Sequence, residues 1–337
     1  MDAVDALNEI AFWLERELAP TFKVQAFRKA AGIIGRLPAA EVEQRAGAGR
    51  LTSLNGIGSR SAEVIAQAVD GIVPEYLANL RRRGAEPLAT GGQELLGRLR
   101  GDLHAHTDWS DGGSSIDLMV AAAAALGREY QALTDHSPNL TVASGLSAER
   151  LTEQLGVIEG LTGAGLRVLT GIEVDILENG DLDQQPALLD RLDVVVASVH
   201  SKLRADSLTM TRRMLAGIRA PHTNVLGHCT GRLLSGTRGT RPPSSFDADR
   251  VFAACAENEV AVEINSRPER QDPPDELIAQ ALDAGCLFSI DTDAHAPGQL
   301  DFLAYGAERA AANGVPADRI VTTWPVERLL AWSRAGR

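Results

Sequence analysis

The segment Gly101–Asp111 reads GDLHAHTDWSD and places two histidines one residue apart, with carboxylates close behind. In a β-strand, residues i and i+2 point to the same side, so His104 and His106 would share a face. Two imidazoles on one face can bind a single metal ion. A pair of histidines also occurs in ordinary loops, so the interpretation depends on the rest of the chain.

Further polar side chains follow six later apolar runs, at the points where these runs end. They are Asp135 and His136, Glu173 and Asp175, His200, His228, then Glu263, Asn265 and Arg267, and finally Asp291, Asp293 and His295. Six of the seven histidines lie at such ends, and His222 is the exception. Because the carboxyl ends of parallel strands meet at one edge of a barrel or sheet, these side chains are expected to converge on a metal site.

The donor types narrow the chemistry of this site. Imidazole nitrogens and carboxylate oxygens without thiolates suit Mn²⁺, Zn²⁺ or Fe²⁺. The donors exceed what one ion can use, so a cluster of two or three divalent ions is expected. Such a cluster can bind a phosphate ester and lower the pKa of a bridging water into the neutral range. Four cations in the same loops are candidates for phosphate binding, with solvated loop charges as the alternative: Lys202, Arg232, Arg267 and Arg270.

From residue 99 onward, short apolar runs alternate with helical patterns. Strands are predicted near residues 100–104, 130–134, 167–172, 193–199, 223–227, 259–264 and 286–290. Amphipathic helices are predicted at Ile116–Leu126, Ala148–Leu161, Ser207–Ile218, Asp247–Glu257 and Asp275–Ala284. This alternation is typical of a parallel sheet, and seven units indicate an α/β barrel close in size to a (β/α)₈ fold.

The first part of the chain has a different pattern. Residues 1–83 are predicted to be wholly helical, since apolar positions recur with helical spacing in Val4–Leu18, Val24–Ile34 and Ala62–Val69. Residues 84–97, GAEPLATGGQELLG, are rich in glycine and are interpreted as a linker. The barrel domain is then expected to occupy residues 98–337.

Composition excludes several protein classes. A formal charge of −12 argues against non-specific binding of polyanions over the whole surface. Cys229, Cys255 and Cys286 lack CxxC spacing, so neither a disulfide framework nor a thiolate zinc site is expected. The first residues do not resemble a signal peptide, and no segment has the composition of a membrane span. A cytoplasmic protein that does not associate with membranes is the expectation.

The motifs HAH, TDH, GIEVDIL, VVASVH, LGH and DTDAH, in this order, resemble the PHP (polymerase and histidinol phosphatase) superfamily of metal-dependent phosphoesterases. The resemblance covers about residues 99–337 and implies a (β/α)₇ barrel. It also implies nine metal ligands, with Glu173 bridging two ions: His104, His106, Asp111, His136, Glu173, His200, His228, Asp293 and His295. Glu173, His104 and His200 are taken as the catalytic candidates.

Within this superfamily, the chain is most similar to the C-terminal PHP domain of bacterial family X DNA polymerases. The segment LTSLNGIGSRSAEVI also resembles a helix-hairpin-helix motif of those polymerases. In such a motif, the turn exposes backbone N–H groups that can bind a DNA phosphate. Gly56, Ile57, Gly58 and Arg60 are therefore candidate DNA contacts. The alternative is a helical packing module that does not bind DNA.

Two departures from the polymerases limit the function. Only residues 84–97 lie where the polymerases carry a nucleotidyltransferase core, so polymerase activity is not expected. Arg60 and Val64 stand at the candidate positions of the lysine that would form a Schiff base with an abasic sugar, so lyase activity is not expected either.

Three hypotheses follow for the function. The first is a metal-dependent phosphoesterase acting on DNA ends, as a 3′-to-5′ exonuclease, a 3′-phosphatase or an enzyme that processes abasic sites. The second is a small-molecule phosphatase of the histidinol-phosphate type. The third is a non-catalytic DNA-binding protein whose barrel is structural.

Overall fold

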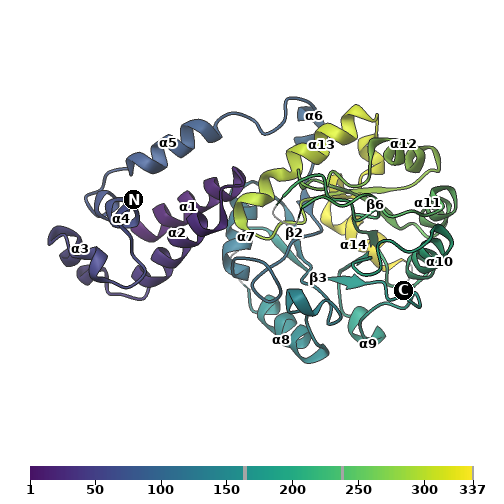
Figure 1. Ribbon diagram of the computed structural model, residues 1–337, viewed down its shortest axis with the longest axis horizontal. Coiled ribbons are helices and arrows are strands. Elements are labelled where there is room, and N and C mark those ends of the chain that lie inside the picture. The colour runs from purple at the N-terminus through teal and green to yellow at the C-terminus, as the bar shows by residue number, and fades with distance from the viewer. Residues whose placement is uncertain (162–164, 237–238, 336–337) are drawn as a thin grey trace. The chain divides into compact units, whose positions relative to one another are not determined.

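The computed structural model describes residues 1–161, 165–236 and 239–335, and the chain separates into two compact units, residues 1–87 and 88–337 (Figure 1). The second unit starts inside the segment interpreted as a linker, residues 84–97. The latter part of that segment forms a short helix, α6 (Gln93–Leu96), which contacts α13 (Leu303–Ala312) of the same unit.

The first unit consists of helices packed around one apolar core. Its elements are α1 (Ala3–Arg16), α2 (Thr21–Ile34), α3 (Ala39–Gly47), the 3₁₀ turn η1 (Leu51–Ser53), α4 (Ser59–Val69) and α5 (Glu75–Gly84). The side chain of Asp2 caps α1 by accepting hydrogen bonds from the backbone N–H groups of Val4 and Asp5. Apolar residues spaced three or four apart, such as Leu7, Ile10 and Leu14, bury one face of α1 in this core.

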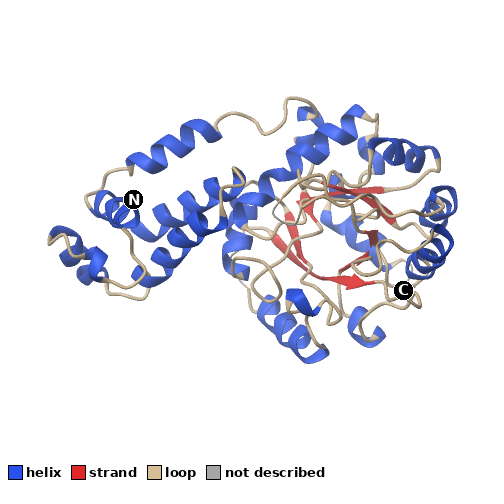
Figure 2. Ribbon diagram, in the orientation of Figure 1, coloured by secondary structure: helices blue, strands red, loops and turns tan. Residues whose placement is uncertain are grey.

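Seven parallel strands, paired in chain order, form the barrel of the second unit (Figure 2). They are β1 (Gly101–Asp102), β2 (Tyr130–Leu133), β3 (Arg167–Asp175), β4 (Val194–Ser198), β5 (Val225–Leu226), β6 (Ala261–Asn265) and β7 (Phe288–Asp291). The seven predicted strands are all present, and the predicted (β/α)₇ architecture is confirmed. The longest strand, β3, pairs with β2 through residues 167–170 and with β4 through residues 171–175.

The first strand is shorter than the predicted residues 100–104. Where β1 meets β7, aspartate side chains accept the backbone N–H hydrogen bonds that backbone carbonyls would accept in a regular pair of strands. The backbone N–H of Leu103 donates to Asp291 Oδ1 at 2.8 Å. The N–H groups of His104 and Thr292 both donate to Asp102 Oδ1, at 3.1 and 3.2 Å. A backbone bridge then closes the barrel between Ala105 and Ala294.

Helices surround the strands of the barrel (Figure 2). Besides α6 and α13, they are α7 (Ile116–Ala125), α8 (Ala148–Glu159), α9 (Pro186–Leu189), α10 (Ser207–Ile218), α11 (Ala248–Glu257), α12 (Asp275–Asp283) and α14 (Val326–Arg334). The 3₁₀ turns are η2 (Thr141–Ala143), η3 (Pro297–Phe302), η4 (Ala317–Arg319) and η5 (Val321–Thr323). Among the described residues, none of the helices is long and apolar enough to cross a membrane.

Successive side chains of a strand point to opposite faces of the sheet, so the strands contribute to two separate apolar clusters. Val194 and Val196 join a cluster that contains residues of β2, β3, β5 and β6 and also Trp324, so this cluster fills the barrel interior. Their neighbours Val195 and Ala197 belong to the larger cluster that the strands share with the surrounding helices.

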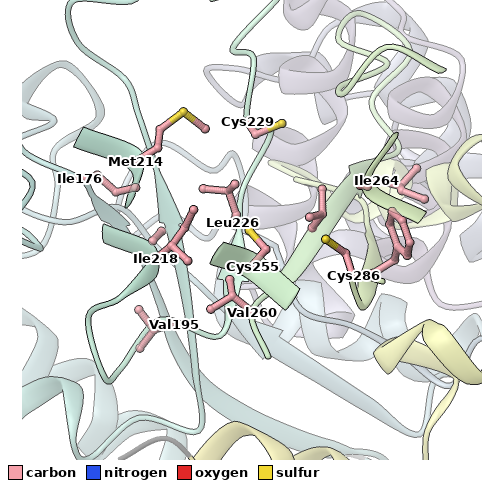
Figure 3. Packing of buried hydrophobic residues seen from close by; sticks show 14 of the residues in the cluster. Ile176, Val195, Met214, Ile218, Leu226, Cys229, Cys255, Val260, Ile264 and Cys286 are labelled. Carbon is pink, nitrogen blue, oxygen red and sulfur yellow. The ribbon is translucent and has the colours of Figure 1, made fainter. Parts of the chain in front are cut away.

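The three cysteines lie in this larger cluster, among side chains such as Leu226 and Ile264 (Figure 3). All three are free and buried, and burial raises the pKa of each thiol, so they are uncharged apolar packing groups.

Candidate metal centre

Six histidine rings meet at the carboxyl ends of the barrel strands. Neighbouring ring centroids lie 4.3–5.8 Å apart, so the rings form one continuous group. The rings are those of His104, His106, His136, His200, His228 and His295. The seventh histidine, His222, lies elsewhere and contacts Asp190 at 2.8 Å, as expected for a residue outside the site.

Glu173 on β3 is buried in the middle of this group. Its Oε1 lies 2.9 Å from His228 Nε2 and 3.2 Å from His200 Nε2. Its Oε2 lies 2.9 Å from His136 Nδ1 and 3.2 Å from His104 Nε2. Glu173 thus shares one possible ligand group with His104 and His228 and a second with His136 and His200, so this carboxylate could contribute to two ion positions.

All nine predicted ligands come together in four overlapping groups, within each of which the donor atoms lie no more than 4.8 Å apart. The groups are His106, Asp111, His136 and His295; His104, Glu173 and His228; His104, His106 and Asp293; and His136, Glu173 and His200. Residues of six different strand ends thus contribute to one centre.

Unsatisfied polar atoms show that this donor set fits metal ions. Nε2 of His104, Nε2 of His200 and Oε2 of Glu173 are buried and have no hydrogen-bond partner among the described residues. Such atoms are costly in a protein interior unless something else satisfies them. Divalent ions bound by imidazole and carboxylate donors would do so.

Asp111 is the candidate ligand of the outer rim, and a tightly wound loop carries it. Its side chain is 32% exposed, compared with 20% for His295 and 13% or less for the other histidines of the centre. The loop is wound so closely that a Cβ at Gly112 would lie 2.7 Å from the backbone of His106 and Thr107. The centre therefore opens toward solvent on the side of Asp111 and His295.

The electrostatics of the centre reflect its burial and its mixed charges. Burial, together with the neighbouring His295 and His136, lowers the pKa of His106 to about 3, so this ring is neutral and able to bind a metal. Burial alone would raise the pKa of Glu173, but the surrounding histidines hold it well below its usual value. Glu173 is therefore an ionised carboxylate at neutral pH.

Comparison with known proteins agrees with this geometry. Residues 102–267 match the family model of the PHP domain, and residues 1–71 match that of a helix-hairpin-helix domain. The barrel is a PHP domain. The resemblance drawn from the sequence motifs is thus confirmed for both units.

Curated proteins that are similar to the chain include a DNA polymerase and a probable phosphatase. DNA polymerase/3′-5′ exonuclease PolX of Bacillus subtilis is 37% identical over 217 residues, which cover 64% of this chain and 37% of the relative. The probable phosphatase YcdX of Escherichia coli is 28% identical over 242 residues, which cover 68% of this chain and 91% of the relative. The chain thus spans little more than a third of the length of the Bacillus protein.

Among solved structures, a histidinol phosphate phosphatase from Lactococcus lactis, complexed with zinc, L-histidinol and phosphate, matches with 19% identity and a TM-score of 0.43. The match covers 58% of this chain and 86% of that one.

A carboxylate behind the ligands of the PHP domain orients one of them. Asp175 Oδ1 contacts His200 Nδ1 at 2.5 Å, which leaves Nε2 of the same ring directed at Glu173. Burial opposes protonation of His200, but Glu173 and Asp175 outweigh it and raise the pKa of the ring to about 9. The sequence places Asp175 at a strand end but does not distinguish this supporting role from that of a ligand.

The four candidate phosphate-binding cations of the PHP domain occupy different surroundings. Arg232 donates to the carbonyl oxygens of Arg270 and Gln271, so its guanidinium links two loops. Arg270 is buried, with Nε 3.0 Å from Asp293 Oδ2, and therefore neutralises a ligand. Arg267 lies beside the rim residue His295, with Nη1 3.0 Å from His295 Nδ1 and Nη2 3.6 Å from Glu269 Oε1.

Lys202 is exposed two residues after His200 and has a left-handed backbone conformation, φ 53°. This conformation is uncommon for a residue other than glycine. Of the four cations, Lys202 is the exposed one, whereas each of the three arginines contacts other groups of the chain.

The candidate DNA contacts lie at the turn before α4 in the helical unit. Gly56 has φ 102°, a conformation that favours glycine, and Gly58 is the N-cap of α4 without a side-chain cap. Ile57 is buried, so only its backbone is available. The guanidinium of Arg60 pairs with Glu63 at 2.7 Å and stacks over Tyr76.

Proposed function

We propose that the chain is a metal-dependent phosphoesterase that acts on DNA ends. The observation that carries this proposal is the complete set of nine ligands on a PHP barrel, in one chain with a helix-hairpin-helix unit. The set includes buried donor atoms that remain unsatisfied without ions. A barrel with a purely structural role has no need of this costly arrangement.

In the proposed chemistry, the bound ions and the side chains of the protein have different roles. Two or three divalent ions, of manganese, zinc or iron, would supply a nucleophile at neutral pH and neutralise charge on the phosphate. Glu173 would hold two of these positions at a fixed separation, with His104 and His200 on its two sides. We infer that the phosphate enters on the side of Asp111 and His295, where the guanidinium of Arg267 beside His295 can receive its negative charge, and we propose Lys202 as a further, exposed phosphate contact.

DNA as the substrate is supported by the helical unit. The N-terminus of α4, with the glycines before it, offers backbone N–H groups to a phosphate. The specific reaction would be 3′-to-5′ exonuclease, 3′-phosphatase or abasic-site processing. Polymerase activity is not proposed, since no nucleotidyltransferase core lies between the two units.

A small-molecule phosphatase is the second candidate. The observation in its favour is the similarity to the probable phosphatase YcdX over 91% of that protein's length. In this case the helical unit would not contribute to turnover. The third hypothesis, a non-catalytic DNA-binding protein, is less well supported, because the metal centre retains every predicted ligand.

The test compares substrates for the full chain with Mn²⁺ present. The substrates are 3′-labelled single- and double-stranded DNA, 3′-phosphorylated DNA and histidinol phosphate, and the Glu173→Gln variant is the blank. Preference for DNA by orders of magnitude, with no turnover in the blank, supports the first proposal. Preference for histidinol phosphate supports the second candidate, and equal turnover by the blank contradicts both.

A further inference from the structure

The carboxylate of Glu263, at the carboxyl end of β6, contacts two metal-ligand histidines at once. Glu263 is fully buried. Its Oε1 lies 2.6 Å from Nδ1 of His104, and its Oε2 accepts a hydrogen bond from the backbone N–H of His228 at 2.5 Å. These two histidines form one of the four ligand groups together with Glu173. Glu263 itself belongs to none of these groups, so it lies behind the centre.

The contact with His104 determines which ring nitrogen is available. A carboxylate only accepts hydrogen bonds, so the proton of His104 must be on Nδ1. The lone pair of Nε2 is then free and points toward Glu173 Oε2, 3.2 Å away. With the other tautomer, Nε2 would carry the proton and could not bind an ion.

Asn265 extends this network to a third ligand. Its Nδ2 lies 3.2 Å from Glu263 Oε2 and 3.2 Å from Asp293 Oδ2. Its Oδ1 accepts a hydrogen bond from the backbone N–H of Arg267 at 3.1 Å, so the amide is fixed in one orientation. Two residues of β6 thus hold ligands that follow β1, β5 and β7.

We propose that Glu263 is a positioning residue of the metal centre. It fixes the tautomer and ring orientation of His104 and anchors the backbone that carries His228. This inference rests on the metal-dependent function proposed above and extends it to a residue that binds neither ion nor substrate. It predicts that metal affinity depends on the negative charge and the two acceptor oxygens of this side chain.

The test is Glu263→Gln in the full chain, with zinc affinity and stoichiometry measured by competition with a chromophoric chelator. Glutamine has nearly the same shape, but it offers one acceptor oxygen and one NH₂ donor. It cannot accept from both His104 Nδ1 and the His228 N–H. If its NH₂ faces His104, it favours the tautomer that cannot bind through Nε2.

Asp190→Asn is the matched control, because Asp190 also pairs with a histidine, His222 at 2.8 Å, outside the centre. We expect the E263Q variant to bind zinc roughly 10- to 100-fold more weakly at one position. In the presence of EDTA its circular dichroism should remain that of the folded protein, with a melting temperature lowered only by the loss of one buried hydrogen bond. The D190N control should bind zinc with unchanged affinity.

A second readout is the tautomer of His104 in the zinc-loaded protein, observed by ¹⁵N NMR of histidine-labelled samples. The Nδ1–H form is expected in the unsubstituted protein, and its loss is expected in E263Q. If E263Q does not fold, Glu263→Asp replaces it: this residue keeps the charge but is too short to reach both partners, so weaker binding is again expected.

Zinc affinity equal to that of the unsubstituted protein, in whichever of these variants folds, would overturn the inference. If the unsubstituted protein itself binds no divalent ion, the proposed function fails instead, and the two failures are therefore distinguishable.

Discussion

Asp135 accepts hydrogen bonds from both the backbone N–H and the hydroxyl of Thr107, at 2.8 and 2.6 Å. The same buried carboxylate accepts from the hydroxyl of Ser110 at 2.5 Å. These contacts attach the loop that carries Asp111 to the end of β2, although Asp111 makes no contact with that carboxylate. The loop of the most exposed candidate ligand is thus anchored by a residue that belongs to none of the four candidate ligand groups.

We predict that Asp135→Asn weakens metal binding at the position formed by His106, Asp111, His136 and His295. The amide replaces one acceptor oxygen by a donor, which leaves a donor group of Thr107, Ser110 or Gln154 unsatisfied and costs about 1–3 kcal/mol. Metal stoichiometry and thermal unfolding would measure this. Ser110→Ala is the milder control, since it removes one hydrogen bond only. Full stoichiometry in D135N would show that the loop holds its shape without this anchor.

Metal removal should destabilise the barrel. Ions that bind only the folded chain contribute about 2.7 kcal/mol each at a concentration of 100 times their Kd. We therefore expect chelation to lower the melting temperature by about 5–10 °C per ion lost, and added Mn²⁺ or Zn²⁺ to restore it. Differential scanning calorimetry with metal analysis of the same samples tests this. An unchanged melting temperature in metal-free protein would contradict the assignment of the centre.

Substitutions of Arg267 and Arg232 by alanine are expected to have different effects on the KM for a phosphate ester. Arg267→Ala should raise KM for a phosphate ester by about tenfold, because it removes a rim guanidinium worth about 1.4 kcal/mol to a bound phosphate. Arg232→Ala should leave KM unchanged and lower the melting temperature, since its guanidinium links two loops through backbone carbonyls. Steady-state kinetics and thermal unfolding of both variants separate the two roles, and a raised KM in R232A would contradict this division.

The turn before α4, where Gly58 is the N-cap, allows phosphate binding to be tested with two matched variants. A Cβ at Gly58 would meet no described atom within 4 Å, and its φ of −84° is compatible with any residue. Aspartate and asparagine are both good N-caps, but aspartate places a negative charge where a phosphate is proposed. Gly58→Asp should weaken DNA binding about tenfold. Gly58→Asn should bind like the unsubstituted protein. Fluorescence anisotropy measures this, and equal binding by both variants would contradict a phosphate site here.

The G58D and G58N variants also distinguish a phosphoesterase that acts on DNA from a small-molecule phosphatase. Turnover of a small phosphate ester should be equal in G58D and G58N, because neither substitution is in the barrel. Loss of DNA turnover in G58D alone would assign the helical unit to substrate binding.

Glu9 and Arg81 make the stability of the helical unit pH-dependent. The two pair at 2.6 Å, and this hydrogen-bonded pair lowers the pKa of Glu9 below its ordinary value of 4.5. A carboxylate with a lowered folded-state pKa adds stability above its ordinary pKa, and this stability is lost as the pH falls through the lowered value.

Glu9→Gln should therefore destabilise the unit at pH 7 by about 0.5 kcal/mol, since the pair is partly exposed. The difference between the two proteins should shrink below pH 4.5. Chemical unfolding followed by circular dichroism at both pH values is the measurement, and a difference that grows on acidification would contradict the assignment.

The convergence of the candidate ligands could be predicted from the sequence because parallel strands bring their carboxyl ends together. His106 and His295 are far apart along the chain, yet residue type and position at a strand end were sufficient to group them. The supporting carboxylates could not be separated from ligands in this way. Asp175 and Glu263 follow the same pattern as Glu173, and only the atoms they face distinguish them.

Long cationic side chains were the least predictable part of the site. Arg232 and Arg270 stand in the expected loops, but one folds back onto carbonyl oxygens and the other onto Asp293. The direction of such side chains depends on loop packing, which the sequence pattern does not encode. The short β1 has a similar cause, because the side chains of Asp102 and Asp291 take over backbone pairing at the barrel closure.

The strict chain order of the strands has a consequence for how the protein matures. The ligand groups that contain Asp293 or His295 also need residues that follow β1, so the first and last strands must meet before these groups exist. Two groups, that of His104, Glu173 and His228 and that of His136, Glu173 and His200, use only residues that precede β7. Complete occupancy of the proposed centre would therefore require the whole barrel, including its last strand.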